Sequence, residues 1–112
     1  MTPPVLKHRL VLETPMSMPD GAGGQTASWA VLGILWGELM PRTGRETTGE
    51  TGPLSTASYR IMVRAAPPGQ SNRPAPGQRL LLGLRRFRIL VVTEADTQGR
   101  YLSCLSEEEV AS

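Results

Sequence analysis

The sequence predicts an all-β fold, a small β-barrel or sandwich of about six strands with a long projecting loop. Short segments in which apolar and polar residues alternate recur along the chain, and stretches rich in proline and glycine separate them. Gly33 and Gly37 disfavour a helix in the most apolar segment, because each costs about 1 kcal/mol relative to alanine inside a helix. The 112 residues suit one domain, residues 1–112, around one core.

Two strands are expected in the first part of the chain. Residues 6–14 alternate and predict a strand. Prolines and glycines, which break both helices and strands, predict a loop with turns at residues 14–25. Residues 26–40 predict a long strand with a bend, because tryptophan, valine and isoleucine favour strands.

Four aromatic side chains are expected in the core: Trp29, Trp36, Tyr59 and Phe87. The two tryptophans lie an odd number of positions apart, so a regular strand would direct them to opposite faces. One bulge, for which Gly33 is the preferred position, would return both to the core.

The middle of the chain predicts a strand between two loops. Residues 41–55 contain almost no apolar residue, and so long a connection without regular structure is uncommon in compact domains unless it is functional or disordered. Residues 57–65 alternate Tyr59, Ile61 and Val63 with a basic outer face. Residues 66–78 form a second loop, rich in proline and glycine and expected to be mobile.

The last third of the chain predicts three strands. Residues 79–84 and 86–93 form two of them, with Gly83 as a tight turn or a bulge. The second directs three side chains to one face, namely Phe87, Ile89 and Val91. The chain then closes with a hairpin turn, a last strand and an acidic tail that is frayed or forms one helical turn, at residues 94–99, 100–105 and 106–112.

Composition narrows the classes of function. The formal charge is only +2, and most of the arginines are scattered among acidic residues rather than gathered as in nucleic-acid binders. Cys104 is the single cysteine, so an intrachain disulfide is excluded and a thiolate metal site would lack ligands. No apolar run reaches the roughly 18 residues of a membrane helix and no signal peptide is evident, so we expect synthesis in the cytoplasm and no contact with a membrane.

Residues for catalysis or cofactor binding are scarce. His8 stands between Lys7 and Arg9 without a carboxylate or cysteine nearby in sequence, and acid–base or metal roles need positioned partners. Cys104 fits a small buried apolar residue, and no third group is indicated that would orient a Cys/His pair. We therefore expect no catalytic residue, no metal, no cofactor and no enzymatic activity.

One basic cluster stands out, formed by Arg85, Arg86 and Arg88 around Phe87. Such a cluster could contact a nucleic-acid backbone. In a strand, however, Arg86 and Arg88 share one face while Phe87 packs on the other, which equally fits a solvated face or a subunit contact. The cluster is therefore a candidate interface or backbone-contact patch.

Several segments, in this order, resemble the head-tail joining family of tailed bacteriophages, also called head completion or stopper proteins, and its counterparts in gene transfer agents. They are HRLVLETP, DGAGGQTASWAVLGILWGEL, the polar loop 41–55, SYRIMVR and GQRLLLGLRRFRILVVTEADTQGRYLSCLSEE. The chain departs from the family as a whole in its longer link at residues 67–77 and in a less aromatic penultimate strand.

The resemblance implies a structural β-barrel at the head–tail interface of a virion or phage-like particle. Its copies would form a ring, a hexamer, that continues the DNA channel between portal or adaptor proteins and the tail terminator or tail tube. The long loop would project toward a neighbouring copy or the channel axis, and would help to retain packaged DNA. By position this role falls on Arg42, Thr43, Gly44, Arg45, Glu46, Thr47, Thr48, Gly49, Glu50, Thr51 and Gly52.

The alternative function is that of a small β-barrel that binds nucleic acid. Stacking of bases needs aromatic side chains exposed on strands, and the expected core claims the few that this chain has. A monomer that binds DNA with a steep salt dependence would favour this alternative, whereas symmetric oligomers would favour the connector.

Overall fold

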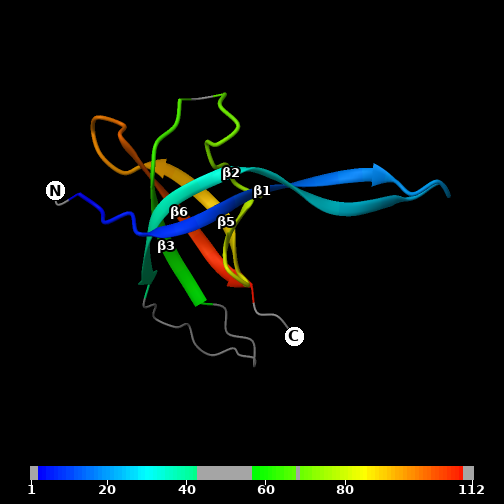
Figure 1. The fold of residues 1–112 in the computed structure, drawn as a ribbon, viewed down its shortest axis with the longest axis horizontal. Coiled ribbons are helices and arrows are strands. Elements are labelled where there is room, and N and C mark those ends of the chain that lie inside the picture. Colours follow the sequence, from blue (N-terminus) through cyan, green and yellow to red (C-terminus); the bar gives the residue numbers. More distant parts are fainter. Residues whose placement is uncertain (1–2, 43–56, 68, 110–112) are drawn as a thin grey trace.

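The computed structural model describes residues 3–42, 57–67 and 69–109. In this part of the chain all regular structure is β-strand, which confirms the all-β prediction. The chain runs through six strands (Figure 1): β1 (His8–Pro19), β2 (Gln25–Arg42), β3 (Ala57–Arg64), β4 (Arg79–Leu82), β5 (Arg85–Glu94) and β6 (Tyr101–Glu109).

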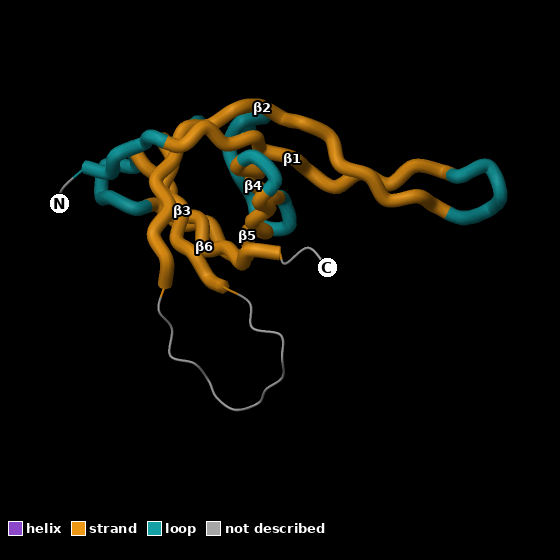
Figure 2. The backbone as a smooth tube through the Cα atoms, turned by 60° about the horizontal axis from the view of Figure 1, so that its bottom comes forward, coloured by secondary structure: helices purple, strands orange, loops and turns teal. Residues whose placement is uncertain are grey.

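The six strands close into an antiparallel barrel in the order β1-β2-β3-β6-β5-β4, with β4 pairing back to β1. Figure 2 shows the closed ring of strands and, leaving it on one side, a long two-stranded extension of β1 and β2. Closure gives every strand two neighbours within the ring, so the ring itself presents no free sheet edge.

Aliphatic side chains from all six strands fill the barrel. The fully buried ones include Leu10 and Leu12 of β1, Ile61 of β3 and Leu102 of β6. Phe87 is also fully buried, as predicted, and Tyr59 packs against this core with its ring 5.2 Å from that of Phe87 in a T-shaped arrangement.

The prediction that both tryptophans enter the core was wrong. A bulge does occur, because Leu12 pairs with Gly33 while Glu13 pairs with Val31, which leaves Leu32 as the extra residue. Trp29 and Trp36 consequently share a face, but this face is the outer one. Trp36 is 52% exposed opposite Arg9, while Leu35 takes the inward position.

The prediction of a loop at residues 14–25 was also wrong, because β1 and β2 extend beyond the barrel as a ribbon, which we call the arm (residues 14–30). β4 pairs with β1 only as far as Glu13. The Asp20 N–H donates across the ribbon to the Gly24 carbonyl, so the even-numbered residues of β1 direct their N–H groups toward β2. By strand alternation, the odd-numbered residues direct theirs toward the side on which β4 pairs. Pro15 is the next such position and has no N–H, so pairing with β4 cannot continue there.

A second bulge alters the expected faces of β5. Ile89 pairs with Ser106 and Val91 with Leu105, so Leu90 is the extra residue. Val92 therefore packs against the core, and Val91, predicted to face inward with Phe87, is exposed. The expected Gly83 turn is present, with φ +62° at the first residue of a two-residue link between β4 and β5.

Residues 106–109 are more regular than predicted, and residues 110–112 of the predicted tail lie outside the described residues. β6 continues to Glu109 instead of giving way at residue 106 to a frayed or helical tail, because it pairs with both β3 and β5 over this length. The turn at residues 94–99 is confirmed, and the Asp96 carboxylate accepts hydrogen bonds from the Arg100 and Tyr101 N–H groups.

Backbone and side-chain hydrogen bonds fix the described part of the second predicted loop, residues 66–78. The Arg73 guanidinium donates to the Ala66 carbonyl, and the Gly77 N–H donates to Ile89 of β5. Gln78 also receives the Ile89 N–H at its carbonyl. These contacts attach the segment to the barrel, which the expectation of a mobile loop did not anticipate.

Within the described residues no helix is long and apolar enough to cross a membrane.

Candidate functional site

One end of the barrel carries a polar cluster built around Arg85, at the start of β5. Its Nε and Nη2 atoms donate to the two carboxylate oxygens of Glu108 at 2.8 and 3.0 Å. Nη2 also lies 3.1 Å from the hydroxyl of Tyr59, and the guanidinium stands 5.0 Å from the centre of the Phe87 ring. Arg85 therefore caps the aromatic end of the core, and β3, β5 and β6 each contribute a side chain to it.

Both members of this ion pair stay charged at neutral pH. The hydrogen bond from Arg85 lowers the pKa of the Glu108 carboxyl, and the same hydrogen bond raises the pKa of Arg85. A hydrogen-bonded ion pair of this kind stabilises a strand end, and neither of its members can act as a general acid or base in the neutral pH range.

The three arginines of the predicted patch do not form one surface. Arg85 pairs with Leu82 and turns to the barrel end, whereas Arg86 and Arg88 lie on the outer face of β5. Their partners across the β5–β6 pairing are Glu109 and Glu107. Opposite charges at directly paired positions compensate each other, so this face lacks the excess of positive charge that phosphate binding needs.

The residues that flank the predicted projecting loop lie at the same barrel end as Arg85. Arg42 ends β2 opposite Ser58, and Ala57 pairs with Glu108, the partner of Arg85. The ends of β2 and β6 and the start of β3 are close together in Figure 1. The other predicted loop residues, 43–52, lie outside the described residues.

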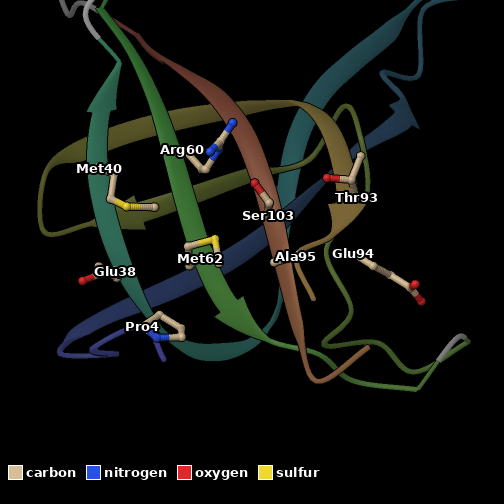
Figure 3. A pocket seen from close by; sticks show the side chains of 9 residues that line it. All are labelled: Pro4, Glu38, Met40, Arg60, Met62, Thr93, Glu94, Ala95 and Ser103. Atoms are coloured by element: carbon tan, nitrogen blue, oxygen red, sulfur yellow. The ribbon is translucent and has the colours of Figure 1, made fainter. Parts of the chain in front are cut away.

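A groove of about 400 Å³ lies on the outer face of β2, β3 and β6 (Figure 3). Met40 and Met62 supply its apolar lining, Arg60 and Ser103 stand beside them, and Pro4 closes one side. Met62 is almost fully buried although it lies on the same outward side of β3 as the exposed Arg60. The groove therefore combines apolar and polar lining.

The two residues with potential nucleophilic or metal chemistry, Cys104 and His8, lie on different strands of the barrel. Cys104 lies inside on β6 opposite Ile61, and burial raises the pKa of its thiol to about 12, which suppresses the reactive thiolate. His8 begins β1 opposite Gly37. In the described part of the chain no three His, Cys, Asp or Glu side chains are grouped as metal ligands.

Sequence reasoning missed the arm and the apolar surfaces beside it. Met16 and Met18 are exposed on the arm, and three more exposed apolar side chains follow β2 on its outer face, namely Val31, Ile34 and Trp36. The signal was present, because Met16 and Met18 alternate with Ser17 as in a strand. The flanking Pro15 and Pro19 concealed it, since prolines usually end strands.

A closed barrel with a protruding arm and exposed apolar strips is typical of structural assembly proteins. The family model described as phage head completion protein matches residues 1–109. The chain belongs to the phage head completion protein family, a family of structural virion proteins, and its place is the virion particle.

A solved structure agrees with this assignment. The chain is similar to a chain in the virion of a native gene transfer agent particle, with a TM-score of 0.81 and 44% sequence identity. The match covers 98% of this chain and 100% of that chain. A comparison with curated proteins gave no match.

Proposed function

We propose that this protein is a head–tail connector that forms a ring, continues the DNA channel between the portal or adaptor and the tail, and helps to retain packaged DNA. The observation that carries the proposal is the full-length similarity, at 44% identity, to a chain found in a gene transfer agent virion. A part of such a particle that binds its neighbours needs surfaces for protein contact, and the exposed apolar strips of β1 and β2 are surfaces of that kind.

The barrel end around Arg85 supports the assignment of DNA retention to residues 42–52. Arg42 and Ala57 flank this segment at the ends of β2 and β3, and the Glu108–Arg85 ion pair stabilises β6, the strand next to Ala57. The strand ends that flank residues 44–52 are therefore held in fixed positions on the barrel. Six copies in a ring, by the family resemblance, would bring six such segments to one level of the channel.

Deletion of the gene from a particle-producing strain tests the proposal. We expect filled heads and separate tails, or heads that have lost their DNA, because the joint between them is missing. Electron microscopy and nuclease protection of the packaged DNA report the two defects, and the wild-type gene supplied in trans is the control. Joined, DNA-protecting particles made without the protein would contradict the connector function.

Removal of residues 44–52 alone separates DNA retention from joining. The shortened protein should still enter particles, while its particles lose nuclease-protected DNA. Normal protection in particles that contain the shortened protein would refute the role of this segment and leave the connector function intact.

Trp36 is exposed on the barrel surface, as base stacking would need, but the nucleic-acid-binding alternative also needs an excess of positive charge, and Glu107 and Glu109 face Arg88 and Arg86. In a titration of the purified protein with duplex DNA we expect weak binding. Tight binding by a monomer, with a steep loss of affinity as salt rises, would contradict the connector reading.

A further inference from the structure

The arm, residues 14–30, is a surface that the barrel itself does not use. It is a ribbon of two strands held together from the pair Thr14–Ala30 to the pair Pro19–Gln25 (Figure 2). A two-stranded ribbon is at best marginally stable in water without a third strand or a packing surface. Within the described structure nothing packs over its outer half, so an external partner would supply the missing contact.

The arm and the barrel carry two apolar surfaces on opposite faces of one sheet. Met16 and Met18 are 45% and 53% exposed, and they continue the face of β1 that buries Leu10 and Leu12 in the barrel. Val31, Ile34 and Trp36, which we call the outer strip, are 62%, 47% and 52% exposed. They pair with Glu13, Val11 and Arg9 on the opposite face of β1.

Charge indicates what kind of partner the arm takes. Asp20 is the single charged residue among residues 14–30. Its carboxylate is occupied within the turn, where it accepts the N–H groups of Ala22 and Gly24 at 2.8 and 3.0 Å. An arm without a free cation has nothing to pair with phosphate, so its partner is an uncharged protein surface rather than DNA or a lipid headgroup.

We propose that the arm packs its Met16–Met18 face on the outer strip of a second copy of this chain, and thereby links successive copies through one repeated contact. The outer strip is an exposed apolar surface on the same chain, and the charged side chains directly paired with it are Arg9 and Glu13, of which Glu13 is already bound by Arg79. Because the two surfaces differ, the contact is heterologous, and repetition of a heterologous contact closes into a ring or extends as a filament. The inference rests on the proposed ring and names the element that joins its subunits.

The base of the arm is built to hold a fixed direction. Arg79 of β4 donates to the Glu13 carboxylate at 2.8 Å, and its guanidinium lies 3.9 Å from the centre of the Trp29 ring. Both side chains of this ion pair are largely buried. A cation between a carboxylate and an indole ties both strands of the ribbon to the barrel at the point where they leave it. A pre-oriented arm loses less conformational freedom when it docks.

Cysteine cross-linking inside assembled particles tests the contact. The variant Met16→Cys/Ile34→Cys is treated with a short bis-maleimide, and buried Cys104 provides a low-background chain. The two new cysteines cannot join within one chain, because positions 16 and 34 lie on opposite faces and about 16 Å apart along the ribbon, at about 3.3 Å per residue. The matched control is Met16→Cys/Leu84→Cys, since Leu84 is 97% exposed and lies on the β4–β5 turn instead of on β2.

Dimers and higher multimers of the chain are expected from the first variant and not from the control. Cross-links from residue 16 only to a different particle protein, or no cross-link in joined particles that contain the variant, would overturn the arm contact while leaving the connector function standing. Absence of the wild-type protein from joined particles would instead overturn the proposed function itself.

Discussion

At the scale of single residues, the tightest constraint in the barrel is Gly37 of β2. A Cβ atom at this position would lie 2.8 Å from Cδ1 of Leu10 and 2.9 Å from the carbonyl oxygen of Met62. The second of these atoms belongs to the backbone of β3 and cannot turn away. β2 crosses between β1 and β3 here, so the absence of a side chain allows three strands to close around the core.

Gly37→Ala is therefore expected to destabilise the fold by about 1–3 kcal/mol, the usual cost of overpacking a filled core. The matched control is Gly33→Ala, because a Cβ at Gly33 meets its nearest neighbour, Asn72, at an ordinary 3.5 Å. Urea unfolding followed by fluorescence measures both free energies of unfolding. Equal stability of the two variants would show that β3 yields at Met62.

At the scale of elements, the Arg85–Glu108 pair ties the β4–β5 hairpin to the last strand. β4 is only four residues long, and the pair stands beside the turn that joins it to β5. The barrel closes through β4, so the ends of this short strand matter more to closure than those of the long strands.

The pair should give stability a defined pH dependence. The pKa of Glu108 is lower in the folded protein than in the unfolded chain, so its contribution is present above about pH 4.3, the pKa of an unperturbed glutamate, and is lost as the pH falls through the folded value. Glu108→Gln should cost on the order of 0.5–1 kcal/mol at pH 7, since Arg85 is partly exposed.

Urea unfolding of the wild type and of Glu108→Gln at pH 7 and pH 3 measures this effect. The difference between the two proteins should shrink at pH 3, because this is below the pKa of an unperturbed glutamate and the stabilisation from the lowered pKa decreases there. The control is Glu107→Gln, one position earlier on the outer face of β6. A difference for Glu108→Gln that does not change with pH would show that the side chain acts through packing.

At the scale of the whole molecule, the barrel and the arm separate into a self-contained part and a dependent part. The buried hydrophobic cluster consists of residues of the barrel, and none of its members lies within residues 14–30. The arm contributes exposed side chains and its base contact with Arg79. The barrel can therefore fold without the arm, whereas the arm depends on the barrel or on a neighbour.

Replacement of residues 15–29 by Asn-Gly, which forms a two-residue turn between Thr14 and Ala30, should leave the barrel folded. We expect a β-type circular dichroism spectrum and a single cooperative thermal transition, at a somewhat lower temperature because the Arg79–Trp29 contact is lost. A chain that no longer unfolds cooperatively would show that the arm belongs to the folding core.

The sequence by itself determined the all-β class, the position of most strands, the β5–β6 turn, the Gly83 turn and a bulge beside Gly33, because these features depend on local alternation and turn chemistry. It also indicated the family, but it placed Arg85 in a patch with Arg86 and Arg88 and did not predict its ion pair with Glu108. Only the tertiary structure decided which face of a strand is the inside: alternation distinguishes two faces without saying which one the barrel encloses, and so Trp36 was misplaced.

Tertiary structure likewise decided what the prolines at residues 15 and 19 mean. Proline ends a strand where a neighbour needs its N–H, yet it is tolerated along a free edge, and whether an edge is free depends on where distant strands lie. β4 stops at Glu13, so the edge beyond is free and the arm persists. Tertiary structure also decided that the positive charges of Arg86 and Arg88 lie opposite the negative charges of Glu109 and Glu107. Strand register brings together charges that lie far apart in the sequence.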